Sequence, residues 1–156
     1  MGDSRLMLRQ AIGLLKERFN PLKLRASSIY RSEPVDFLEQ PWFYNQVVVM
    51  EARAELLPTQ LLKGLQAIEL QLGRVKTQRY GPRCIDLDLL LYENWVLETN
   101  ILTVPHPKLE ERAFVLYPLV ELEPGLINPR TSRRISEVLA EKSSEFSACE
   151  RVKEDE

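Results

Sequence analysis

The stretch RYGPRCIDLDLLLY, residues 79–92, sets two carboxylates into an apolar run directly behind a basic glycine-proline turn. Its part CIDLDLLLY, residues 84–92, is rich in aliphatic side chains and is predicted to form a strand. Because successive side chains of a strand point to opposite faces, Asp86 and Asp88 would share one face, about 6.6–7 Å apart. The aliphatic side chains would occupy the other face.

Two interpretations of this aspartate pair are open. Asp-x-Asp is a short, common pattern, so it fits the solvated face of a half-buried strand with its carboxylates paired to arginines. Alternatively, a divalent cation would relieve the repulsion between two buried like charges. Mg²⁺ suits such a site, because it takes one or two carboxylates and completes its shell with water and phosphate oxygens.

The basic turn GRVKTQRYGPR, residues 73–83, favours the metal interpretation. It has no acidic residue, and its cations are Arg74, Lys76, Arg79 and Arg83. Carboxylates that hold a metal, together with guanidinium groups, suit a nucleoside triphosphate, so phosphoryl or pyrophosphoryl transfer is the predicted reaction class. The sequence has no GxxxxGK[ST] loop, so side chains would have to hold the triphosphate.

The single histidine, His106, lies between two prolines in LTVPHP. A lone histidine is more often a packing or surface residue than a catalyst. One that is fixed between prolines could instead donate to a phosphate. Spacing alone supports the two roles equally.

Composition bounds the class of protein. A length of 156 residues and a net charge of -2 predict one domain, over residues 1–145, and argue against a generic binder of nucleic acid or membrane surfaces. The two cysteines form no metal-ligand cluster, so free thiols are expected. No apolar run is long enough for a membrane span and no signal peptide is evident, so a soluble cytoplasmic protein is expected. The charged segment 146–156 is expected to be a flexible tail.

Apolar spacing predicts two helices. The first carries Leu8, Ala11, Ile12, Leu15 and Phe19 on one face, with Asp3 or Ser4 as a cap and Asn20-Pro21 as its end. The second begins at Pro58, carries Leu61, Leu65, Ile68 and Leu72 with Glu69 beside them, and ends at Gly73. Strands are predicted over residues 23–31 and 43–53, and short helical pieces around residues 119–122 and 135–142.

The order helix, strand, strand, helix, strand is a split βαββαβ unit without its first strand. We therefore expect an α+β, ferredoxin-like fold: an antiparallel sheet with helices on one face, lacking the first strand, followed by a loop-rich C-terminal part.

Four runs stand out together: RYGPRCIDLDLLLY, LTVPHPKLEERAFVLYPLVEL, IELQLGRV and QPWFYNQVVVME. With them, the chain resembles the 6-hydroxymethyl-7,8-dihydropterin pyrophosphokinase family of folate biosynthesis, and the resemblance extends from about Gly2 to about Asn128. The resemblance implies an Mg²⁺-dependent enzyme that uses two Mg²⁺ ions and ATP as co-substrate. It would transfer the β,γ-pyrophosphate of ATP to the pterin hydroxymethyl group and release AMP.

The same resemblance assigns site residues. Asp86 and Asp88 match the ligands of both ions, and Arg74 and Arg83 match catalytic arginines that engage the phosphates. ATP-binding positions match Glu69, Lys76, Leu89, Thr103, His106 and Arg112. Pterin-binding positions match Ser32, Val35, Phe43, Asn45, Tyr80 and Phe114, with the two phenylalanines on either side of the ring and Tyr80 closing over it. Without the resemblance, core packing would be the preferred explanation of Phe43 and Phe114, whereas a buried amide such as Asn45 needs partners.

Two departures bear on these expectations. Ile101 stands where some relatives have an arginine near the ATP, and relatives carry an apolar strand before the first helix. We expect the natural product to start upstream, or a second chain to supply that strand; otherwise a monomer is expected. The alternative functions are a non-catalytic, truncated module that binds nucleotide or pterin, and a magnesium-dependent nucleotidyl- or glycosyltransferase.

Overall fold

The computed structural model describes residues 2–33, 42–74 and 85–153. The chain divides into two compact units. The first unit consists of Met1–Leu24 with Met50–Leu89, and the second of Arg25–Val49 with Leu90–Glu156. No helix among the described residues is both long and apolar enough to cross a membrane.

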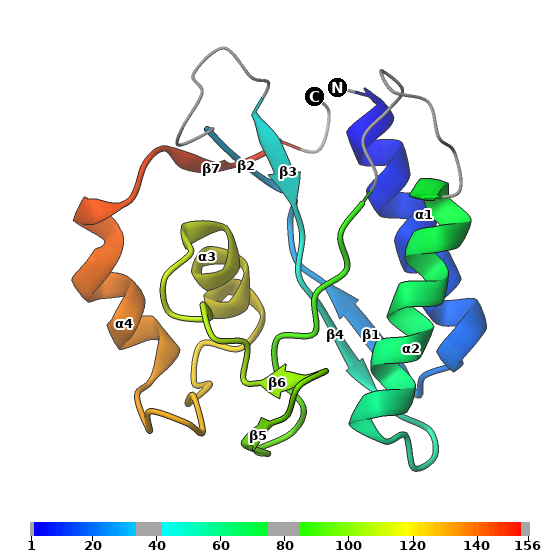
Figure 1. Ribbon diagram of the computed structural model, residues 1–156. Coiled ribbons are helices and arrows are strands. Elements are labelled where there is room, and N and C mark those ends of the chain that lie inside the picture. The colour runs from blue at the N-terminus through cyan, green and yellow to red at the C-terminus, as the bar shows by residue number, and fades with distance from the viewer. Residues whose placement is uncertain (1, 34–41, 75–84, 154–156) are drawn as a thin grey trace. The chain divides into compact units, whose positions relative to one another are not determined.

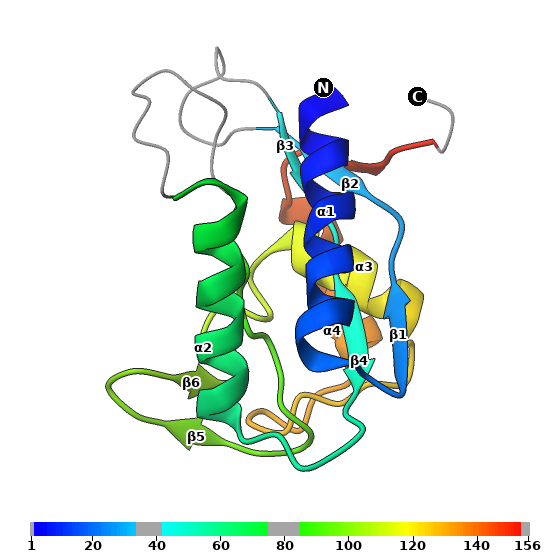
Figure 2. The same cartoon turned by 90° about the vertical axis from the view of Figure 1, so that its right-hand side faces the viewer.

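Two helices, α1 (Gly2–Phe19) and α2 (Pro58–Glu69), lie side by side in the first unit (Figure 2). The predicted stripe of α1 is confirmed by burial of Ala11 and Leu15. Because α1 begins at Gly2, the prediction of a cap at Asp3 or Ser4 is wrong. The predicted end is correct: Asn20 takes a positive φ of 43°, and its N–H donates to the Lys16 carbonyl over 2.9 Å.

Helix α2 begins at Pro58 as predicted, and the Leu57 N–H donates to Gln60 Oε1 over 2.8 Å. Its stripe is buried at Leu61, Leu65, Ile68 and Glu69. A π-helical turn, η1 (Leu70–Arg74), continues the helix and contains Gly73 at φ 155°. That angle favours glycine and explains why the helix ends there.

Each of the two long predicted strands is broken into two shorter ones. They are β1 (Lys23–Ala26) and β2 (Tyr30–Ser32), then β3 (Phe43–Asn45) and β4 (Val48–Glu51), of which β1 and β4 pair with each other. The break involves side chains: Val47 N–H donates to Ser27 Oγ over 3.0 Å, and Gln46 Nε2 donates to the Ser27 carbonyl over 2.7 Å. Side-chain bonds thus replace part of the backbone ladder.

The sheet of the second unit has the order β3-β2-β7, all antiparallel, with Tyr30 opposite both Asn45 and Arg151 (Figure 1). Strand β7 (Cys149–Arg151) lies in the segment expected to be a flexible tail. There the expectation is wrong, because the strand pairs with β2 and the Val152 N–H donates to the Ile29 carbonyl over 2.8 Å. Val152 is also buried.

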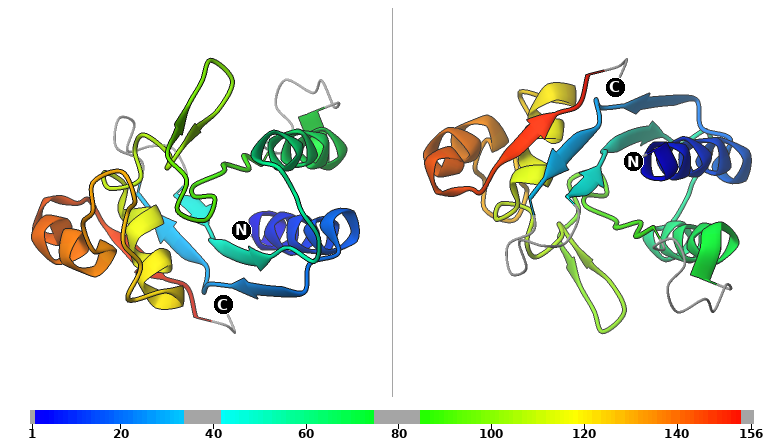
Figure 3. Two further views of the ribbon diagram at one scale, coloured as in Figure 1. Left: turned by 90° about the horizontal axis from the view of Figure 1, so that it is seen from below. Right: turned by 90° about the horizontal axis from the view of Figure 1, so that it is seen from above.

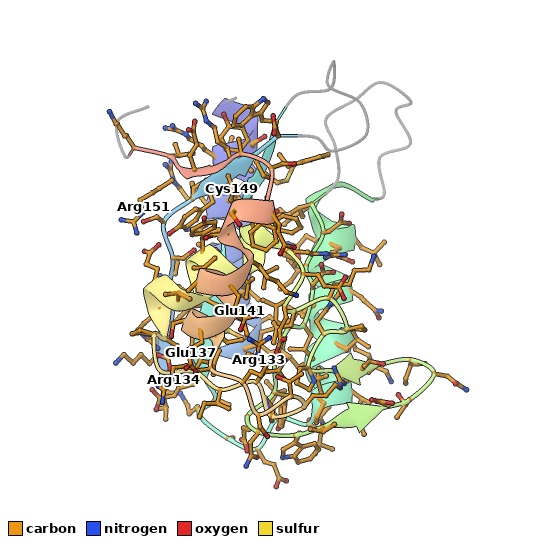
Figure 4. All side chains as sticks on the ribbon, turned by 90° about the vertical axis from the view of Figure 1, so that its left-hand side faces the viewer. Arg133, Arg134, Glu137, Glu141, Cys149 and Arg151 are labelled. Carbon is orange, nitrogen blue, oxygen red and sulfur yellow. The ribbon has the colours of Figure 1, made fainter. Side chains whose placement is uncertain are left out.

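The core of the second unit is built on α3 (Ala113–Leu122) and α4 (Ile135–Lys142), which pack against each other (Figure 3). Its buried members are Val47, Leu109, Val115, Leu116, Leu119, Ile135 and Val138. The hairpin β5 (Leu97–Glu98) and β6 (Thr103–Val104) and the short helix η2 (Ser143–Glu145) complete the unit. Ion pairs of Arg133 with Glu141 and of Arg134 with Glu137 lie along α4 (Figure 4).

The α+β class is confirmed, but the ferredoxin-like sheet is not, since the described strands form three separate sheets. The predicted strand at residues 84–92 is wrong for its described part, residues 85–92, which has no strand partner among the described residues. Part of the cause is visible. The Leu87 N–H donates to a side chain, and the Leu90 carbonyl accepts from the His106 N–H outside any ladder.

Candidate functional site

In the first unit, the two aspartates lie on the exposed side of residues 85–89. Asp86 and Asp88 are exposed, while the alternating Ile85, Leu87 and Leu89 are partly buried. The predicted two-residue alternation therefore holds without a strand ladder.

Glu69 fixes this segment from the end of α2. Its side chain is buried, and its Oε2 accepts the Leu87 N–H over 2.6 Å. Leu87 separates the two aspartates, so this bond restrains the backbone at the centre of the Asp-x-Asp pattern. A backbone N–H to a carboxylate is a charge-assisted bond, stronger than a neutral one.

Magnesium fits the chemistry of this donor set. Within residues 2–33, 42–74 and 85–153, no three His, Cys, Asp or Glu side chains gather as a complete metal cage. Two exposed carboxylates are nevertheless what a protein supplies to Mg²⁺ when water and phosphate oxygens complete its shell.

The basic turn is described only at its start. Arg74 is the last residue of η1. Lys76, Tyr80, Arg83 and Val35 lie outside the described residues. Their expected roles therefore stay predictions.

In the second unit, backbone bonds hold His106 on both sides. Its own N–H donates to the Leu90 carbonyl over 2.8 Å, and its Nδ1 accepts the Lys108 N–H over 3.0 Å. Because Nδ1 accepts, a neutral ring carries its proton on Nε2. The imidazole can therefore present Nε2 as a donor. Thr103, in β6, lies opposite Glu98 in the same hairpin.

Arg112 and Phe114 are brought together at the start of α3. The Arg112 carbonyl accepts the N–H groups of Val115 and Leu116, each over 3.0 Å. Its guanidinium carbon lies 5.5 Å from the centroid of the Phe114 ring, a cation-π distance. An expected phosphate-binding group and an expected pterin-stacking ring are thus direct neighbours.

Three of the expected pterin-binding residues lie on the β2–β3 pair. Ser32 is buried opposite Phe43, a residue that is 40% exposed, so core packing does not explain that phenylalanine. Asn45 Nδ2 is buried and has no hydrogen-bond partner among the described residues. A buried amide donor without an acceptor costs free energy, and such exceptions call for an explanation such as a bound ligand.

Comparison with known proteins decides the family. The family model for 7,8-dihydro-6-hydroxymethylpterin-pyrophosphokinase (HPPK) matches residues 1–124. The chain belongs to the HPPK family. This confirms the resemblance seen in the sequence.

Individual relatives agree. The 2-amino-4-hydroxy-6-hydroxymethyldihydropteridine pyrophosphokinase of Bacillus subtilis is 43% identical over 122 residues, which cover 78% of this chain and 72% of the relative. The protein of the same name from Aquifex aeolicus is 37% identical over 149 residues, 96% of this chain and 91% of the relative. The folic acid synthesis protein fol1 of Schizosaccharomyces pombe is 42% identical over 139 residues, which are 89% of this chain but only 19% of that longer protein.

Two features of this HPPK-family chain were not predicted from its sequence. One is the bond from Leu87 to Glu69. The other is Arg130, whose Nη1 donates to the Pro105 carbonyl over 2.6 Å, 25 residues away in sequence and next to His106. Arg130 lies beyond the family match, and no local pattern marks it.

A charged cluster on β2, α3 and β7 stabilises the second unit. Tyr30 Oη donates to Glu121 Oε1 over 2.8 Å, while the backbone N–H and hydroxyl of Ser28 donate to Glu121 Oε2 over 3.0 and 3.1 Å. Burial raises the pKa of Glu121, but these bonds and the nearby Arg151 outweigh it, so the pKa is lowered. Burial, with the Glu121 contact, raises the pKa of Tyr30.

The thiol of Cys149 lies on β7 and is not in a disulfide. Burial, with a smaller contribution from Glu150, raises the pKa of Cys149 to about 11. The group is therefore a neutral thiol near pH 7, and Cys84 lies outside the described residues.

Proposed function

We propose that this chain transfers the β,γ-pyrophosphate of ATP to 6-hydroxymethyl-7,8-dihydropterin and releases AMP. The observation that supports this best is the bond between Glu69 and Leu87. It restrains the Asp86–Asp88 segment with both carboxylates exposed, in a chain that belongs to the HPPK family. A single domain that acts as a monomer is part of the proposal.

In the first unit, Asp86 and Asp88 would hold Mg²⁺, two ions by analogy with the family. Bound there, the metal would neutralise charge on the phosphate oxygens. Arg74 and Arg83 would stabilise the charge that develops on the phosphates, with Lys76 beside them. Glu69 and Leu89 would lie near the nucleoside, and Glu69 also restrains the aspartate segment.

In the second unit, Nε2 of His106 would donate to a phosphate, and the Arg112 guanidinium would bind another. Thr103 would contact the nucleoside. Phe43 and Phe114 would stack on the pterin with Tyr80 over it, and Ser32 and Val35 would line its edge. The unpaired amide of Asn45 would bond to that edge.

The proposed reaction needs alignment more than covalent help from the protein. The hydroxymethyl oxygen attacks the β-phosphorus, and the bond from that phosphorus to the oxygen bridging to the α-phosphorus breaks. AMP leaves with the electron pair, and the hydroxyl proton passes to solvent.

The test is AMP formation from ATP, Mg²⁺ and 6-hydroxymethyl-7,8-dihydropterin by the purified chain. We expect pterin-dependent AMP that is lost in the double variant Asp86→Ala, Asp88→Ala and retained in Glu55→Ala, an exposed carboxylate of the same unit. Binding of ATP and pterin by a folded chain without AMP would refute catalysis and support the non-catalytic module. Release of pyrophosphate with transfer of AMP to an acceptor, or binding of a nucleotide-sugar in place of the pterin, would point to the nucleotidyl- or glycosyltransferase alternative.

A further inference from the structure

A tight turn, residues 128–133, follows the family-matched region. Asn128 is only 3% exposed, and its Oδ1 accepts the Arg130 N–H over 3.0 Å. The Ser132 N–H donates to the Asn128 carbonyl over 2.7 Å, and the Asn128 N–H donates to the Arg133 carbonyl over 2.8 Å. Backbone and amide bonds therefore fix the shape of the 128–133 turn.

This turn is attached to the segment 103–112 through Glu110. Both Asn128 Nδ2 and Thr131 Oγ1 donate to Glu110 Oε2, over 2.8 and 2.5 Å. Lys142 Nζ donates to the Glu110 carbonyl over 2.9 Å. The segment that carries Thr103, His106 and Arg112 is thus bonded to a structure outside the family match.

Arg130, in the 128–133 turn, contacts the backbone next to His106 and the side chain of Glu98. Its Nη1 donates to the carbonyl of Pro105, a fully buried residue directly before His106. Its Nε lies 3.5 Å from Glu98 Oε2, and Glu98 is the cross-strand partner of Thr103. One guanidinium therefore contacts β5 at Glu98 and the residue that directly follows β6, next to two expected nucleotide-binding residues.

The hydrogen bonds of Arg130 do not account for its presence as a stabilising residue. Its Nε and Nη2 are buried without hydrogen-bond partners among the described residues, and the contact of Nε with Glu98 is an ion pair only. Buried donors without acceptors raise the free energy of the folded state. A chain with an apolar side chain of similar length at position 130 should therefore be about as stable. We therefore look for the role of Arg130 in the backbone that it positions, which is the Pro105 carbonyl next to His106.

We propose that Arg130 is a positioning residue for nucleotide binding: it fixes Pro105 and so sets where His106 presents its Nε2–H. The ring itself is held through Nδ1 by Lys108, and Arg130 holds the backbone immediately before it. The proposal rests on the proposed function only in naming the triphosphate as what His106 binds.

The first test reads His106 directly and needs no activity. His106 is the only histidine in the chain, so its ring nitrogens can be observed by ¹⁵N NMR without ambiguity. At a pH where the ring is neutral, we expect the Nε2–H tautomer in the wild type and a mixture of tautomers in Arg130→Met. Arg130→Lys should restore part of the wild-type signal, and Arg134→Met, a surface control, should leave it unchanged.

The second test measures Mg·ATP binding and steady-state kinetics. In Arg130→Met we expect the Kd and KM for ATP to rise about tenfold. This is the effect of losing one charged hydrogen bond, here the bond from His106 to the triphosphate. The KM for the pterin and kcat should change less than about twofold. The thermal midpoint should stay close to wild type, which separates positioning from loss of structure.

The outcomes separate the two proposals. An unchanged tautomer and unchanged ATP affinity in folded Arg130→Met would overturn the role of Arg130, as would equal losses in Arg134→Met. If Arg130→Met does not fold, Arg130→Lys decides by the same two measurements. A wild type that makes no AMP but shows the expected change in His106 and in ATP binding would refute the pyrophosphokinase and leave the positioning role intact.

Discussion

At the scale of single residues, Asn45 is a side chain whose buried donor the fold leaves unsatisfied. Its amide Nδ2 is buried without a partner among the described residues. We predict that Asn45→Leu, which keeps the number and branching of the side-chain heavy atoms, leaves the free energy of unfolding equal or higher, because it removes an unpaired buried donor. The same change should weaken pterin binding by about tenfold or more. Thermal unfolding and titration calorimetry with the pterin measure the two effects.

The neighbouring Gln46 provides the control for Asn45. Gln46 Nε2 donates to the Ser27 carbonyl over 2.7 Å, so its donor is satisfied. Gln46→Leu should therefore destabilise the fold by about 1 kcal/mol. If Asn45→Leu and Gln46→Leu destabilise equally, the Asn45 amide is paired in solution and carries no signal for a ligand.

Glu121 makes the stability of the second unit depend on pH. Its pKa is lowered from the ordinary value of 4.5 by bonds from Tyr30 and Ser28 and by Arg151, against burial, so the folded state favours the carboxylate. This stabilisation is complete above the unfolded pKa and is lost as pH falls through the lower folded pKa. Urea midpoints measured from pH 6 to pH 3 should fall less steeply in Glu121→Gln than in the wild type. Parallel slopes would contradict the assignment.

Sequence was informative at this scale where a side chain depends on its immediate neighbours. The shared exposed side of Asp86 and Asp88 followed from two-residue alternation. The partner of Leu87 did not, because Glu69 lies 18 residues earlier on another element. Arg130 was missed for the same reason.

At the scale of elements, helices were predicted better than strands. Periodicity and the end signals at Asn20, Pro58 and Gly73 are local, so α1 and α2 were found with their ends nearly correct. Strands depend on partners that the sequence does not reveal. The breaks at residues 27–29 and 46–47 involve bonds between Ser27 and the 46–47 segment.

The packing of α1 on α2 gives a prediction with a built-in control. A Cβ at Gly64 would lie 2.3 Å from Phe19 Cζ, whereas one at Gly13 in α1 would meet nothing within 4 Å. Gly64→Ala should therefore destabilise the chain by about 1–3 kcal/mol through overpacking, partly relieved if the ring moves. Gly13→Ala should stabilise it by roughly 0.5–1 kcal/mol. Equal gains from both changes in chemical denaturation would show that Phe19 does not pack against Gly64.

At the scale of the whole molecule, the largest surprise is β7. Residues 149–151 lie in the charged segment that was predicted to be a flexible tail, yet they pair with β2 near the start of the chain. Arg151 also lies 3.5 Å from Glu121 Oε1, on α3. The prediction used only the charge and the position of the segment itself. The strand is stabilised by residues about 120 positions away, such as Tyr30, which those two properties do not reveal.

Ligand binding should also raise the free energy of unfolding of the whole chain. A ligand that binds only the folded chain adds about 2.7 kcal/mol to the free energy of unfolding at a hundred times its Kd. For a chain of this size, that corresponds to roughly 5–10 °C in the thermal midpoint. We therefore predict such a shift with ATP and Mg²⁺ together, and a much smaller one with ATP and excess EDTA.

The variants decide what causes the shift. If Asp86 and Asp88 hold the metal, Asp86→Asn, Asp88→Asn should remove most of the Mg²⁺-dependent part while leaving the midpoint without ligand nearly unchanged, since both side chains are exposed. Glu69→Gln keeps its shape but loses the charge that receives the Leu87 N–H, so it should lower both the free midpoint and the shift. A double asparagine variant that keeps the full Mg²⁺-dependent shift would place the metal elsewhere, whatever its activity.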